Sequence, residues 1–214
     1  MNRITRYFVT FIVLIFCVSC EDLVQNVEPS ILFVDDELLD DEAQIPFLLK
    51  GVERHFRSTL GLVTTFADGL SDELDSDPAD WGTTELSMEI DSGILLLDNS
   101  SVGELNDALG EYRLHADNLV ERIGRITFTD DELRERALFE AHFHAAIARY
   151  FYATYLGLEP EVGGGVIDAG PYIPSEQMYA LALQELEMAL LHAMMPYQQK
   201  LVHSLEARIH LFEA

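Results

Sequence analysis

The chain of 214 residues has very little positive charge. Lysine and arginine together number 13 against 38 aspartates and glutamates, the formal net charge is −25, and the only lysines are Lys50 and Lys200. Such a surface would repel nucleic acid and anionic headgroups, so we expect no nucleic-acid partner. A solvated extracellular surface, an adaptation to salt and weak cation screening would each explain the acidity, and the sequence does not choose between them.

The sequence also lacks the motifs of common catalytic and metal sites. It has no HExxH and no serine in a nucleophile elbow. Among its seven histidines, His142 and His144 are two apart, which on a helix points them to different sides. His203 and His210 are seven apart and could share a face, but no third ligand lies near them in sequence. We therefore expect no enzymatic activity, no metal site and no cofactor.

The first 19 residues have the pattern of a bacterial lipoprotein signal peptide. Arg3 and Arg6 form a basic region, and the apolar run from Tyr7 to Val18 has the length of a signal-peptide core, about 7 to 15 residues, too short to span a bilayer. The sequence Cys17-Val18-Ser19-Cys20 then resembles a lipobox with Cys20 as the lipidated residue, although a cysteine stands where leucine is usual. An ordinary secretory signal or an uncleaved anchor is the alternative.

A cleaved lipoprotein would keep one cysteine, Cys20, whose sulfur would carry lipid. No disulfide could then form within the mature chain, so the fold would rest on packing. Residues 20–30 form a polar tether in this interpretation. Its first residues, Glu21 and Asp22, resemble the acidic signal that sends some lipoproteins to the external face of the outer membrane. We therefore expect a lipid-anchored protein of the outer membrane that faces the exterior.

The remainder, residues 31–214, has the apolar spacing of an all-α domain. This spacing predicts helices over Ile45 to Gly69, Val102 to Ile126, Glu176 to Met195 and Tyr197 to Phe212. Leu86 to Leu97 is a short helix or a strand. The last two helices, separated at Pro196, would form a hairpin like those stacked in tetratricopeptide solenoids, although the roughly 34-residue repeat of those proteins is absent.

The central element is expected to be a helix from Arg134 to Gly157, a run with no proline and no internal glycine. We expect Thr129 to cap it, with Glu132 reaching back, and Ser175 to cap the following helix. One face is made of alanines and another of larger apolar residues, and a helix that is apolar on two sides needs neighbours on both. The two faces are Ala137, Ala141, Ala145 and Ala148, and Phe139, Phe143, Ile147 and Tyr150.

Two irregular segments each carry an aromatic residue that could contact a ligand. Trp81, the only tryptophan, follows an acidic proline-containing loop, and Tyr172 lies in the glycine-rich stretch 158–174. An aromatic side chain on a loop can stack on a sugar ring, although a lone tryptophan more often packs at the edge of a core. Three consecutive glycines at 163–165 follow a helix and precede no Lys-Ser or Lys-Thr, so we do not interpret them as a phosphate loop.

Several features, in their order along the chain, resemble the SusD/RagB family. They are the lipobox, Glu140, Ala141, Phe143, Ala146 and Gly157 at the spacing of the family's central helix, the glycine-rich loop, Tyr179-Ala180, and the run from Leu205 to Phe212. The sequence departs from the family at His144 and Ala145, where Leu-Arg is usual, and it lacks the Val-Pro-Leu that usually follows the glycine.

Family members are surface lipoproteins that sit over a TonB-dependent transporter and capture glycans or other nutrients. The resemblance implies stacked helical hairpins with loop insertions, an oligosaccharide or other nutrient as ligand, and a transporter of the SusC type as partner. Residues 31–214 would be an incomplete SusD-like helical domain, from a truncated product or a minimal relative, and Leu201, Leu205 and Ile209 could then expose an apolar patch. A helical lipoprotein that holds a protein partner without binding a ligand is the alternative.

Overall fold

The computed structural model describes residues 36–71, 73, 89–90, 99–156 and 173–213. Contacts within the chain divide it into two units, Met1–Leu39 and Asp40–Ala214. The described residues of the first unit form a single short 3₁₀ helix, η1 (Asp36–Leu39). The helices discussed below all belong to the second unit.

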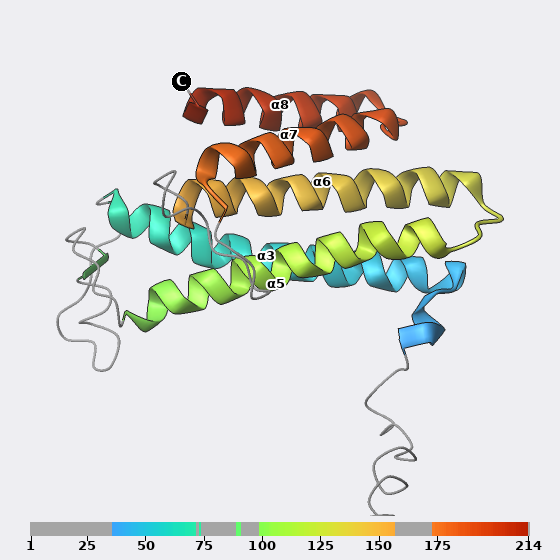
Figure 1. The fold of residues 1–214 in the computed structure, drawn as a ribbon, viewed down its shortest axis with the longest axis horizontal. Helices are drawn as coiled ribbons and strands as arrows, with labels where there is room; N and C mark the ends of the chain where they lie inside the picture. Colours follow the sequence, from blue (N-terminus) through green and yellow to red (C-terminus); the bar gives the residue numbers. More distant parts are fainter. Residues whose placement is uncertain (1–35, 72, 74–88, 91–98, 157–172, 214) are drawn as a thin grey trace, which may run out of the picture. The chain divides into compact units, whose positions relative to one another are not determined.

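The described part of the second unit is built of helices packed on one another. A short 3₁₀ helix, η2 (Glu42–Gln44), is followed by α3 (Ile45–Leu70), α5 (Ser100–Arg125), α6 (Asp131–Leu156), α7 (Ser175–Leu191) and α8 (Pro196–Glu213). Figure 1 shows α6 in the middle, with α3 and α5 on one side and α7, then α8, on the other. The predicted all-α class is confirmed, while the tetratricopeptide-like stacking of hairpins stays a prediction.

Two helices have nearly their predicted limits. Helix α3 begins at the predicted residue and ends one residue later than predicted. Helix α5 begins two residues early, after Asn99, whose side-chain oxygen accepts hydrogen bonds from two first-turn N–H groups that would otherwise have no partner. Apart from residues 89–90, the predicted helix or strand Leu86 to Leu97 lies outside the described residues.

Helix α6 is buried on two faces, as its sequence predicts. The four alanines of one face are completely buried, and they pack against α3 and α5. On the other side Phe139 and Tyr150 join a core with residues of α7 and α8. The larger apolar residues do not all face the same way, however, because Ile147 belongs to the core with α3 and α5, and Phe143 packs against both cores.

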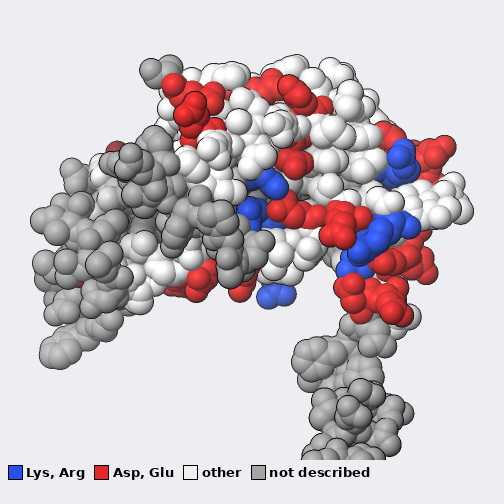
Figure 2. Space-filling model, viewed as in Figure 1, with Lys and Arg blue, Asp and Glu red and all other residues white. Residues whose placement is uncertain are grey.

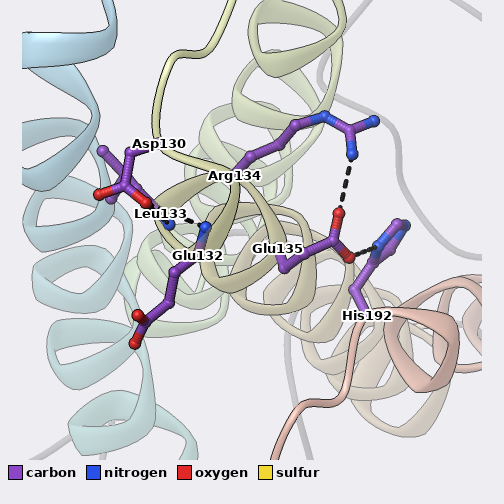
Figure 3. A network of polar contacts seen from close by, with 6 residues as sticks. All are labelled: Asp130, Glu132, Leu133, Arg134, Glu135 and His192. Carbon is purple, nitrogen blue, oxygen red and sulfur yellow. Dashed lines mark hydrogen bonds and ion pairs between the residues drawn. The ribbon is translucent and has the colours of Figure 1, made fainter.

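The N-terminus of α6 is not the predicted capping box. Asp130, rather than Thr129, is the cap, because its carboxylate accepts hydrogen bonds from the N–H groups of Glu132 and Leu133 at 2.9 and 3.0 Å (Figure 3). A carboxylate satisfies these N–H groups and also meets the positive end of the helix dipole. Thr129 instead donates its N–H and hydroxyl to Glu42 at 2.9 and 2.8 Å. Both bonds lower the pKa of Glu42, and the bond from the Thr129 N–H has the larger effect.

Helices α7 and α8 differ from prediction where they begin and end. Ser175 is the first residue of α7 rather than its cap, and its hydroxyl donates to the carbonyl of Ala153 in α6 at 2.9 Å. Helix α7 ends at Leu191 rather than near Met195. Pro196 is the first residue of α8, a position where its missing N–H is not needed.

The apolar patch predicted on α8 is only partly present. Ile209 is completely buried, because it packs into the core that α6, α7 and α8 share. Leu201 and Leu205 are half-buried. The prediction was therefore wrong for Ile209, while the two leucines lie at the edge of the space described next.

Candidate functional site

An apolar pocket of about 290 Å³ lies over α6, between α3 and α8. Helix α3 contributes Phe56 and Leu60, and α8 contributes Leu201, Ser204, Leu205 and Arg208. Helix α6 provides the remaining lining residues, Phe143, Ile147, Tyr150 and Phe151. Because most of these side chains are aliphatic or aromatic, the pocket suits an apolar ligand.

The pocket follows from how the three helices pack. Side chains three or four residues apart share one face of a helix. Phe56 and Leu60 therefore lie on the same face of α3, and Leu201 and Leu205 lie on the same face of α8. Helix α3 packs mainly on α5, and α8 mainly on α7, so neither helix covers the part of α6 that lies between them. The pocket therefore has a floor on α6 and two walls that are partly open to solvent.

Arg208 is the one charged residue of the pocket lining. Its guanidinium carbon lies 5.8 Å from the centre of the Tyr150 ring, within the range of a cation–π contact. In the part of the chain that the structure describes, Arg208 forms no ion pair, in contrast to Arg149, which binds Asp117 at 2.7 Å. The pocket thus carries a positive charge that no acid of the described helices neutralises directly.

The Tyr150 ring belongs to an aromatic cluster at one end of the pocket. Its centre lies 5.4 Å from that of Phe151, 6.4 Å from that of Tyr179 and 6.0 Å from that of Phe212. Burial raises the pKa of Tyr179 and of Tyr155, so both hydroxyls stay protonated at neutral pH. The cluster therefore offers apolar surface and neutral hydroxyls rather than a nucleophile.

His142 and His144 point to different sides of α6, as predicted. The His142 Nδ1 atom lies 2.7 Å from a carboxylate oxygen of Glu185 in α7. Arg149, two helical turns further along α6, lies 3.9 Å from the same carboxylate and 2.7 Å from Asp117 of α5. These polar contacts link α5, α6 and α7, an arrangement that stabilises packing.

His144 faces the opposite side, toward α3 and α5. Its Nδ1 atom lies 2.6 Å from the Tyr112 hydroxyl, and its ring meets the Phe56 ring edge to face with centres 5.6 Å apart. Burial lowers the pKa of His144 to about 4 and raises the pKa of Tyr112 well above its ordinary value. At neutral pH a neutral hydroxyl and a neutral imidazole therefore share this hydrogen bond.

Three histidines beyond α6 also contact carboxylates. His192, just after α7, lies 2.7 Å from Glu135, which accepts a second bond from Arg134 at 2.8 Å (Figure 3). His203 and His210 each bind a glutamate three residues further along α8, at 2.8 and 3.0 Å. Among the described residues, no group of three or more histidine, cysteine, aspartate or glutamate side chains could hold a metal ion.

The residues predicted to contact lipid or ligand lie outside the described part of the chain. They are Cys20, Trp81 and Tyr172. The pocket itself was not predicted, although several of its residues, such as Phe143, Ile147 and Leu205, were placed on apolar faces of the correct helices. Arg208 gave no separate signal, because one arginine in an amphipathic helix is ordinary. The signal that could have pointed to the pocket is a surplus of apolar residues on α6 and α8.

A comparison with protein families, curated proteins and solved structures finds no match for this chain. None of the described helices has both the length and the apolar character needed to cross a membrane. The surface that Figure 2 shows carries many acidic side chains, with basic ones mostly next to them.

Proposed function

We propose that this protein is a lipoprotein of the outer membrane, anchored through Cys20 and facing the exterior. It binds a nutrient and delivers it to a TonB-dependent transporter of the SusC type without chemistry. The lipoprotein signal and the SusD/RagB-like residues of α6 support this proposal. The observation that carries it is the order of these features, a lipobox at Cys20 followed by Glu140, Ala141 and Phe143 at the family's spacing within one long helix, α6.

The nutrient we expect is an oligosaccharide. Trp81 and Tyr172 are the residues proposed to stack on its rings, since aromatic faces pack well against the apolar faces of sugars. His142, His144 and His192 contact a carboxylate or a hydroxyl of the protein itself, which is an arrangement of packing rather than of acid–base catalysis. We therefore propose a binding protein and not an enzyme.

Isothermal titration of the mature chain against a panel of oligosaccharides tests ligand binding. We expect saturable heat with at least one member, and we expect Trp81→Ala or Tyr172→Ala to weaken that binding by about tenfold, the effect of losing one stacking contact. Tyr197→Ala, which removes an exposed aromatic ring of α8, is the matched control and should leave the affinity unchanged. Absence of heat across the whole panel would count against the oligosaccharide.

A second function, the binding of a protein partner without a nutrient, is favoured by one observation. The turn between α7 and α8 exposes Leu191, Met195 and Tyr197, with 75%, 54% and 66% of their surface accessible. Exposed apolar residues that lie together often mark a protein contact, and methionine adapts well to varied partners. This alternative predicts partner capture with no sugar binding, and a gene neighbourhood with a transporter and glycoside hydrolases would speak against it.

A further inference from the structure

The pocket between α3 and α8 combines an apolar interior with a single positive charge. Phe56, Tyr150 and Leu205 present rings and a branched chain to the same space from three different helices. Arg208 lies at that space with its guanidinium over the Tyr150 ring. A ligand that matches this surface has an apolar body and one negative group.

The charge of Arg208 is available to a ligand in a way that the charges of the ion-paired arginines are not. Arg122 and Arg149 are each held by an aspartate of the same unit, and Arg57 by a glutamate one turn away. Arg208 is held by a ring face, and within the described helices it has no carboxylate partner. Since a guanidinium binds a carboxylate through two parallel N–H donors, a carboxylate is the anion that fits it best.

The acidity of the whole chain does not prevent such binding. At physiological salt, charges more than about 8 Å apart are largely screened, so a carboxylate in contact with Arg208 interacts mainly with that guanidinium. The volume of the pocket, about 290 Å³, lies near the lower end of the range of ligand pockets, about 300 to 1,000 Å³, and therefore suits a small ring or a short chain.

We propose that the pocket between α3 and α8 binds a small apolar monocarboxylate, with its hydrocarbon body against Phe56, Tyr150 and Leu205 and its carboxylate on Arg208. This inference goes beyond the proposed function, because it concerns a site distinct from Trp81 and Tyr172 and a ligand other than a sugar. Its failure would leave the oligosaccharide titration unaffected, and the reverse also holds.

Titration of the mature chain with 3-phenylpropanoate, followed by NMR of leucine and isoleucine methyl groups, tests the proposal. We expect saturable shifts at Leu60, Ile147 and Leu205 with a dissociation constant of about 1 mM or tighter, in keeping with the small size of the probe. The neutral isostere 3-phenylpropanamide should bind about tenfold more weakly, because it lacks the charge that pairs with Arg208.

Three variants complete the test. Arg208→Gln should weaken 3-phenylpropanoate binding about tenfold and make the two probes bind alike, while Leu205→Trp should fill the pocket and abolish both. Arg57→Gln makes the same change of charge on α3, outside the pocket lining, and should bind the acid as the unaltered chain does. Melting curves confirm that each variant is folded. Absence of saturable shifts at the pocket, equal binding of acid and amide, or equal losses in Arg208→Gln and Arg57→Gln would each overturn the proposal.

Discussion

Replacing Ala145 by leucine is expected to lower the free energy of unfolding by about 3 kcal/mol, one of the largest effects of any single substitution in this protein. Ala145 is completely buried on the alanine face of α6, in the core with α3 and α5. A leucine there would push against side chains such as Tyr112, which is itself fully buried. Because leucine and alanine are both good helix formers, the loss would report packing rather than helix propensity.

The matched control is Ala207→Leu, which makes the same change at an exposed position of α8. Urea denaturation of both variants measures the effect, and the control should stay within about 0.5 kcal/mol of the unaltered chain. If the two variants were equally stable, α6 would not lie closely against α3 and α5 through its alanines.

Lowering the pH from 6.5 to 4 is expected to cost about 3 kcal/mol of stability through His144 alone, since its pKa falls from 6.5 in the unfolded chain to about 4 in the fold. Between these values the unfolded chain binds a proton that the folded chain does not. The contribution is therefore fully present above pH 6.5 and is lost as the pH falls toward 4.

The contribution of His144 can be separated by comparing Tyr112→Phe with the double variant Tyr112→Phe/His144→Phe. Both lack the tyrosine hydroxyl, and only the first retains the titrating imidazole. Urea denaturation at several pH values should show a steeper loss of stability below pH 6.5 in the single variant. His115, whose pKa is also lowered, by burial first and then by His55, is present in both and cancels. Parallel pH profiles would mean that His144 is not buried in neutral form.

The sequence was sufficient for the features that depend on local spacing. The alanines of α6 recur every three or four residues, so their burial on one face could be predicted from helix geometry alone. The same geometry placed His142 and His144 on opposite sides, where they contact α7 and α5. The all-α class followed from the same periodicity in the other helices.

Features that depend on residues distant in sequence could not be predicted in this way. Thr129 and Asp130 compete for the cap of α6, and the outcome depends on Glu42, which binds Thr129 from 87 residues away. The pocket likewise arises where α3 and α8 leave α6 uncovered. Periodicity shows which face of a helix is apolar, but it does not show which neighbouring helix packs against that face or how much of the face that helix buries.

Recovery of a transporter from the outer membrane is the most direct test of the proposed function. A tagged chain expressed in its native host is cross-linked, extracted in mild detergent and purified, and bound proteins are identified by mass spectrometry. We expect a TonB-dependent transporter of the SusC type to be enriched over the level found with an unrelated lipoprotein carrying the same tag. Enrichment should be lost with Cys20→Ser, which removes the lipid anchor. A transporter recovered equally with the unrelated lipoprotein, or none at all, would contradict the proposal.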